Sequence, residues 1–172
     1  MINDMYTTIL KWGIPQIKEL ENRDIQFIFD SSKIPTNNKY YKSLNCQSLK
    51  CEKNDVKFCL YDFTNEEIIF CMEFFKPNNS LLSITNNLPH MKLQLLNVTD
   101  VRLRKLGIAS YYIKKLQEYC IKENLHYIEI SPNPNAKDFK NQSKENALQL
   151  EDLKKFYLSK STKEMPIKLT LI

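Results

Sequence analysis

The stretch from Lys92 to Ile130 limits the folds open to this chain more than any other. Lys92 to Val98 is strand-like and a loop follows it. From residue 107 onward, apolar side chains recur at the i, i+3 and i+4 spacing of an amphipathic helix. A second strand-like run lies at His126 to Ile130. Strand, helix and strand in this order predict a crossover unit whose two strands are parallel neighbours in one sheet.

Further elements are predicted on both sides of this crossover unit. Val56 to Phe63 and Ile68 to Phe75 are rich in β-branched and aromatic residues and predict an antiparallel hairpin. Near-helical apolar spacing over residues 14–29 predicts one or two N-terminal helices. After the unit, the sequence predicts a helix from about Ser143 to Leu158 and a final strand from Met165 to Ile172.

These elements together indicate one α/β domain over residues 1–172, with a mixed, mostly antiparallel sheet. The parallel pair is expected at its centre and helices on both of its faces. We expect an N-terminal helical region over 1–55, a core over 56–130, and a C-terminal helix and strand over 131–172. With 42% hydrophobic residues, nine Phe and nine Tyr, the chain can fill a sizeable core.

The composition limits the cellular compartment and the classes of binding partner that we expect for this protein. A formal net charge of +5 is a mild excess that suits a polyanionic small ligand as well as nucleic acid. The five cysteines contain no Cys-x-x-Cys pair, so we expect no metal site, and we expect buried thiols in a reducing cytosol. No apolar segment approaches the ~20 residues of a membrane span, and no signal-peptide pattern is present. We therefore expect a cytoplasmic protein.

Gly107 is one of only two glycines in the chain. It stands directly before the amphipathic helix, where it indicates a backbone conformation that other residues adopt only at a cost. The N–H groups of a helix's first turn have no partner within the helix and bind phosphate readily. Arg104 and Lys105 add formal charge, Ala109 leaves room for a close approach, and Arg102 stands near enough to reach further phosphates. The junction therefore predicts an anion-binding site.

The chain lacks both Gly-x-x-x-x-Gly-Lys-Ser/Thr and Gly-x-Gly-x-x-Gly, the familiar phosphate-binding patterns. Arg104, Gly107 and Ala109 instead fit Arg-x-x-Gly-x-Ala, with a strand before them and a helix and strand after. In these residues the segment 92–130 resembles the GCN5-related N-acetyltransferase (GNAT) superfamily, whose pyrophosphate-binding signature is Arg/Gln-x-x-Gly-x-Gly/Ala. The first half of the chain resembles that superfamily only in the order of its elements.

The resemblance implies that acetyl-CoA lies in a V-shaped opening where the two parallel strands splay apart. It implies an acyl-CoA-dependent N-acyltransferase in which a primary amine attacks the thioester directly while backbone donors polarise its carbonyl. The acceptor would be a small-molecule or peptide amine, with its pocket shaped by the hairpin and residues 31–53, including Tyr40 and Tyr41. The implied cofactor-binding residues are Asn97, Val98, Arg102, Arg104, Lys105, Leu106, Gly107, Ile108, Ala109, Ser110 and Asn133.

Two residues are candidates for the proton transfers that this reaction needs. The family often supplies a tyrosine from its last helix as the general acid for the departing thiolate, and Tyr157 occupies the matching place. The family's frequent glutamate on the cofactor strand has no counterpart within 92–98. Glu73 on the preceding strand is the nearest candidate base, and water is the alternative route for the proton.

Other interpretations stay open at the level of sequence. The Gly-Phe that usually follows the family's tyrosine is absent, which also fits a catalytically degenerate CoA-binding or regulatory module. The positive charge also fits a nucleic-acid-binding protein, whose affinity falls steeply with salt, although the excess is small. Gly107 could simply mark close packing of a helix on the sheet, Tyr157 could be a core residue, and His90 a loop residue. With only Met165 to Ile172 as a last strand, a homodimer partner could complete the sheet edge.

Overall fold

The computed structural model describes residues 4–35, 48–136 and 142–170. Within these residues the strands are β1 Ile25–Ile28, β2 Lys50–Glu52, β3 Asp55–Asp62, β4 Glu67–Phe75, β5 Met91–Val98, β6 Ile128–Ile130 and β7 Ile167–Leu169. The helices are α1 Asp4–Trp12, α2 Asn79–Thr85, α3 Ile108–Lys122 and α4 Leu150–Lys160, with 3-10 turns η1 Lys18–Leu20, η2 Ser31–Lys33 and η4 Val101–Leu103.

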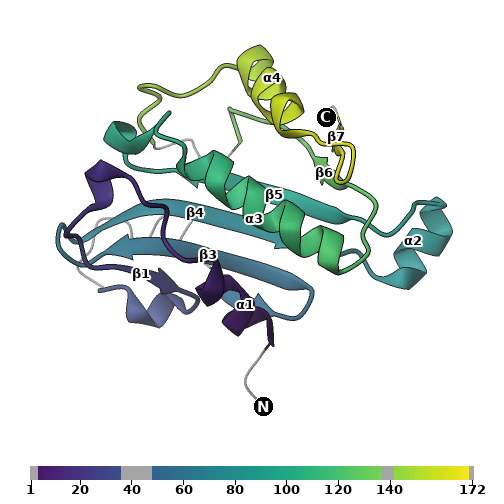
Figure 1. Cartoon of the computed structure of the whole chain (residues 1–172), viewed down its shortest axis with the longest axis horizontal. Coiled ribbons are helices and arrows are strands. Elements are labelled where there is room, and N and C mark those ends of the chain that lie inside the picture. Colours follow the sequence, from purple (N-terminus) through teal and green to yellow (C-terminus); the bar gives the residue numbers. More distant parts are fainter. Residues whose placement is uncertain (1–3, 36–47, 137–141, 171–172) are drawn as a thin grey trace.

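All seven strands belong to one mixed sheet with the order β1-β3-β4-β5-β6-β7, and β2 pairs with β3 (Figure 1). The pairs β1–β3, β2–β3, β3–β4 and β4–β5 are antiparallel, whereas β5–β6 and β6–β7 are parallel. The predicted α/β class with a mixed, mostly antiparallel sheet is therefore confirmed. The second parallel pair arises because α4, like α3, connects two strands that run in the same direction.

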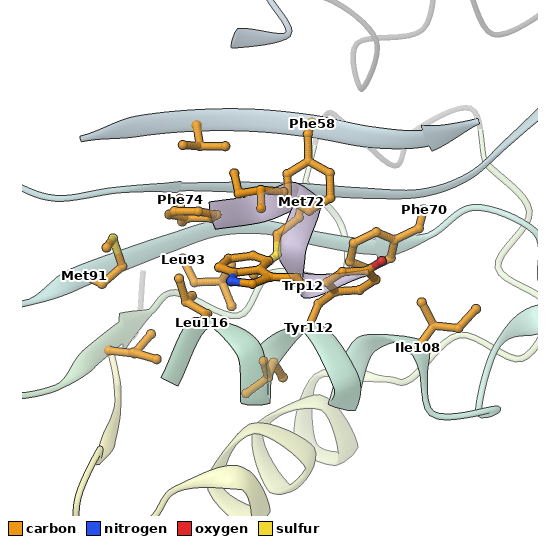
Figure 2. Close-up of a cluster of buried hydrophobic side chains, with 14 of the residues drawn as sticks. Trp12, Phe58, Phe70, Met72, Phe74, Met91, Leu93, Ile108, Tyr112 and Leu116 are labelled. Carbon is orange, nitrogen blue, oxygen red and sulfur yellow. The ribbon is translucent and has the colours of Figure 1, made fainter. Parts of the chain in front are cut away.

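The main core lies between the sheet and the helices α1 and α3, and we call it the first-face core. Figure 2 shows its aromatic side chains meeting between the strands and α3. The Phe70 and Tyr112 rings stack with centroids 4.7 Å apart, and Trp12 stacks on Phe74 at 5.9 Å. Tyr157 of α4 belongs to the same core. Aromatic side chains of this size contribute most of the buried apolar area that fixes α1 and α3 on the sheet.

The opposite side of the sheet carries a smaller cluster, which we call the second-face core. Its buried residues are Ile28, Ile34, Cys59, Tyr61, Ile68, Cys71 and Leu95, with Leu49 packed against them. Ile34 ends the turn η2, so a short helical segment covers this face where α1 and α3 cover the other. Because β3 contributes to both cores, it is buried on both faces.

The prediction of helices over residues 14–29 is wrong. The N-terminal α-helix is α1, whose buried residues Met5, Ile9 and Trp12 form one stripe. Gly13 follows it with a φ of +71°, a left-handed conformation at which an α-helix ends. Residues 25–28 form β1 instead, because the alternation of this short run fits pairing with β3, and tertiary pairing overrides the helical spacing.

The predicted start of the last helix at Ser143 is also wrong. The helix α4 begins at Leu150, after Gln149. The backbone before it is held elsewhere, since the carbonyl oxygens of Ser143 and Glu145 accept hydrogen bonds from Arg104. In the described part of the chain, no helix has both the length and the apolar character needed to cross a bilayer.

Candidate functional site

The parallel strands β5 and β6 separate at a β-bulge. Against β4, Phe74 pairs with Leu93 and Glu73 pairs with Leu95, so Gln94 is an additional residue in β5. The pairing of β5 with β6 stops at the same place, with Leu93 opposite Ile130. Beyond Leu93, β5 continues to Val98 beside β4 alone. The bulge therefore bends β5 where the parallel pair opens.

Two cavities flank this opening. The larger, of about 660 Å³, lies among the end of β5, the first turn of α3, the segment before α4, and α4 itself. The smaller, of about 310 Å³, lies between β5 and β6 and extends to the residues after Ile130. Leu96, Leu153 and Tyr157 line both cavities. The two cavities therefore meet beside Tyr157.

The larger cavity is strongly cationic. Among the described residues, four basic side chains line it and one acidic side chain does so, that of Asp152. The basic ones are Arg104, Lys105, Lys144 and Lys155. Because the cavity is concave, these charges act together on a bound anion more than the same charges spread over a convex surface would.

The N-terminus of α3 opens into the same cavity. Its N-cap, Gly107, has a φ of +94° and makes no side-chain capping bond, and the carbonyl oxygen of Gly107 accepts the first helical hydrogen bond from the Tyr111 N–H. The residues from Gly107 to Ser110 line the cavity, and the N–H groups of a first turn have no partner within the helix. These dipoles add partial positive charge to the four basic side chains.

Gly107 is required by its backbone conformation and not by close packing. A Cβ atom built at this position meets no atom within 4 Å. The alternative that Gly107 marks a tight helix-on-sheet contact is therefore wrong. A side chain here would instead project into open space at the mouth of the helix.

Arg104 lines the larger cavity but also acts as a clamp. Its Nε donates to the carbonyl oxygen of Val98 at 2.9 Å, and its Nη1 donates to that of Ser143 at 2.8 Å and to that of Glu145. Burial lowers the pKa of this guanidinium, which nevertheless stays protonated. Arg104 thus joins the end of β5 to the segment before α4 and keeps its charge at the cavity wall.

The remaining predicted cofactor residues divide into two groups. Asn97, Val98, Lys105, Ile108, Ala109 and Ser110 line the larger cavity, and Asn133 lines the smaller. Leu106 lines neither and packs against the first-face core. Arg102 also lines neither cavity, and its contact with phosphate stays a prediction. Its Nη2 lies 2.6 Å from Glu67 and 2.7 Å from Asp100, so these carboxylates hold the guanidinium away from the opening.

Tyr157 and Glu73, the predicted acid and base, lie in different surroundings. Tyr157 is 6% exposed at the junction of the two cavities, and burial raises the pKa of its hydroxyl, which therefore stays protonated. Glu73 lines neither cavity, and its carboxylate lies 3.5 Å from the Lys57 Nζ. Glu73 pairs with Leu95, whose side chain enters the second-face core, so Glu73 lies on the second face of the sheet outside both cavities, and its role as base stays a prediction.

The sequence interpretation missed the charged residues of the smaller cavity. Lys92 and Glu129 are cross-strand partners on β5 and β6 and both line it. They alternate with Met91, Leu93, Ile128 and Ile130, which enter the first-face core, so they lie on the second face of the sheet. This alternation of charged and apolar residues on two predicted parallel strands was the available signal.

The tyrosines expected near the acceptor pocket and the possible metal ligands complete the comparison with the sequence predictions. Tyr40 and Tyr41, expected near the acceptor pocket, lie outside the described residues. Among the residues that the structure describes, no group of three or more His, Cys, Asp or Glu side chains is arranged to hold a metal ion.

Fold and site together define a mixed α/β protein with a split parallel strand pair and a cationic cavity at a helix N-terminus. No protein-family model matches the chain, and no curated protein matches it. Among solved structures, integron cassette protein VCH_CASS6 from the mobile metagenome of V. cholerae is similar over 65% of this chain and 76% of its own chain, with 15% identity and a TM-score of 0.39. A similarity of this extent assigns neither family nor function.

Proposed function

We propose that the protein is an acyl-CoA-dependent N-acyltransferase of the GNAT kind, which transfers an acetyl group from acetyl-CoA to a primary amine. The observation that carries this proposal is the position of the cationic cavity. It joins the open N-terminus of α3 to the end of β5, beyond the point where β5 and β6 part. The N-terminus of α3 suits a pyrophosphate. The opening beside β5 suits an extended pantetheine arm.

The chemical fit can be followed along the cavity. Pyrophosphate oxygens would accept hydrogen bonds from the first-turn N–H groups between Gly107 and Ser110. Lys105, Lys144 and Lys155 supply charge that balances the phosphates. Beyond Gln94, the edge of β5 that faces β6 has no paired strand among the described residues, so its backbone groups, except the Val98 carbonyl that accepts from Arg104, are available to the amides of the pantetheine arm.

Tyr157 fits the role of proton donor in this reaction. It lies where the two cavities meet, and no hydrogen-bond partner of its hydroxyl is found among the described residues. Because burial raises the pKa of Tyr157, the group enters the reaction protonated. The neutral amine forms the new C–N bond as the C–S bond breaks, the Tyr157 hydroxyl protonates the departing thiolate, and Tyr157 regains a proton released from the new amide nitrogen.

Turnover of Tyr157→Phe tests this function. We expect thiol release from acetyl-CoA in the presence of a panel of primary amines to fall about 10²-fold in kcat, with acetyl-CoA affinity unchanged, because only proton donation is lost. Tyr119→Phe, a half-buried position on α3 that lines neither cavity, is the matched control. Equal turnover by Tyr157→Phe and the wild type would remove Tyr157 from the mechanism. Acetyl-CoA binding by a wild type without any turnover would favour the catalytically degenerate module.

A further inference from the structure

A cluster of charged and titratable side chains lies on the second face of the sheet, at the floor of the smaller cavity. Its centre is Glu129 of β6, which is 16% exposed and lines the cavity. Glu129 Oε1 lies 3.0 Å from the Lys92 Nζ, and Oε2 lies 3.3 Å from Nε2 of the buried His90. Each carboxylate oxygen therefore faces a different nitrogen.

The hydrogen bonding of His90 defines where its ring proton is. Nδ1 lies 2.8 Å from the carbonyl oxygen of Leu88, which can only accept, so Nδ1 carries a hydrogen. In the neutral ring, Nε2 then carries the lone pair. This buried nitrogen makes no hydrogen bond among the described residues, although Glu129 Oε2 lies 3.3 Å from it. The site therefore places a buried nitrogen without a hydrogen bond beside a carboxylate that lines the cavity.

Within the part of the chain that the structure describes, the charged groups around His90 include no second acid. Its ring stacks on Tyr127 with centroids 4.6 Å apart, and the Lys168 ammonium from β7 lies 3.9 Å from the centroid of the Tyr127 ring. Lys92 on β5 and Glu129 on β6 complete the charged groups that face this site. Lys92 balances the Glu129 charge before the proton arrives, and after uptake the cluster carries one positive charge more.

Resting on the proposed acyltransferase function, we propose that the smaller cavity takes the acceptor amine and that Glu129, positioned beside His90, removes its proton. An amine reaches the site as an ammonium ion, whose N–H bond breaks as the proton passes to Glu129. The freed lone pair forms the C–N bond to the acyl carbon, and the C–S bond breaks. The thiolate gains a proton from Tyr157, which recovers one from the new amide nitrogen. Glu129 then returns its proton to solvent.

This arrangement also restricts the acceptor. A cavity of about 310 Å³ floored by one carboxylate suits a small primary ammonium group or a single alkylamine side chain, with the amine nitrogen directed at Glu129. The cofactor enters from the α3 side and the acceptor from the second face, and they meet beside Leu96 and Tyr157. Glu129 is the catalytic residue in this scheme and His90 is its positioning residue.

Kinetics of Glu129→Gln test the catalytic part. The amide has the same shape but accepts no proton, so we expect kcat with a small primary amine to fall at least about 10²-fold at neutral pH. We also expect the fall to shrink as rising pH deprotonates the free amine, while the KM for acetyl-CoA stays unchanged. Glu118→Gln, an exposed change on α3, is the matched control and is expected to retain full turnover. A Glu129→Gln enzyme with wild-type kcat and pH profile overturns the proposal.

Nitrogen-15 NMR of the histidine rings gives a readout that does not need turnover. The chain has only two histidines, and the exposed His126 serves as an internal reference. We expect His90 to keep its hydrogen on Nδ1 and its Nε2 resonance to differ between Glu129→Gln and the wild type at the same pH, because the substitution removes the carboxylate 3.3 Å from Nε2. The same Nε2 resonance in both proteins overturns the placement of Glu129 beside His90.

Different results would overturn the proposed acyltransferase function and the proposed role of Glu129. Absence of acetyl-CoA binding by the wild type overturns the proposed function and this inference together. Normal acetyl-CoA binding and turnover in Glu129→Gln, with unaltered His90 resonances, overturns this inference alone. His90→Gln is a secondary variant, because His90 is 1% exposed and its loss also removes packing on Tyr127. Glu129→Gln, a substitution at the cavity surface, is therefore the decisive test of this inference.

Discussion

At the scale of single residues, the cavity mouth depends on one unusual backbone conformation and one buried guanidinium. Gly107 adopts a φ of +94°, and the preceding Lys105 is also left-handed at +65°. These two left-handed residues lie directly before the first turn of α3, and they line the larger cavity together with Arg104. Glycine adopts such a conformation without the steric cost that a Cβ imposes.

Gly107→Ala tests the conformational requirement. A Cβ at Gly107 has space around it, so the expected loss comes from the left-handed backbone alone and amounts to about 1 kcal/mol in the free energy of unfolding. Urea denaturation measures it. Gly13→Ala, at a φ of +71°, is the comparison and is expected to lose a similar amount. A Gly107→Ala protein as stable as the wild type would contradict the strained junction.

At the scale of elements, the opening between β5 and β6 comes from the Gln94 bulge, and the anchoring of α3 comes from its first turns. Tyr112 on α3 is fully buried, and its hydroxyl donates to the carbonyl oxygen of Gly13 at 2.9 Å. The neighbouring Tyr111 hydroxyl donates to that of Trp12. These bonds join α3 to the end of α1, so the helix that carries the anion site is held at its N-terminal half.

Tyr112→Phe tests this anchor. The substitution keeps the ring in the first-face core but leaves the Gly13 carbonyl without its donor, which is expected to cost about 1 to 2 kcal/mol of unfolding free energy. Tyr119→Phe on the same helix is the control. Denaturant titration monitored by fluorescence of Trp12, the only tryptophan, reports the difference. Equal midpoints for the two variants would mean that the hydrogen bond contributes nothing.

At the scale of the whole molecule, local sequence patterns predicted more of the sheet than of the site. The hairpin follows from its β-branched and aromatic residues, and α3 follows from its periodicity because it buries one regular face. The strands β5 and β6 follow from their places before and after α3. The strand β1 and the start of α4 do not, since distant partners decide them: β3 for the first and Arg104 for the second. The residues of the site divide in the same way, into those set by local sequence and those set by distant contacts. The junction at Gly107 is local in sequence, whereas Lys144, Lys155 and Glu129 reach the cavities only through the fold.

The buried thiols report on the integrity of the whole fold. Cys59, Cys71 and Cys120 are fully buried, and burial raises the pKa of Cys120 to about 12 and that of the partly buried Cys51 to about 11. Thiolates are the reactive species, so these thiols are expected to be inert in the native protein. With Cys46 and Cys51 replaced by Ser, the remaining three should react with a disulfide reagent in one phase at the rate of global unfolding. Rapid native-state labelling would contradict the packing on both faces.

Isothermal titration calorimetry with acetyl-CoA tests the central claim most directly. We expect the wild type to bind, and we expect Ile84→Trp, which adds the same indole at an 83% exposed position on α2, to bind equally well. Gly107→Trp should retain the fold but lose binding at least about 10²-fold, because its side chain projects into the space that the pyrophosphate would occupy. No binding by the wild type, or full affinity in Gly107→Trp, would contradict the account.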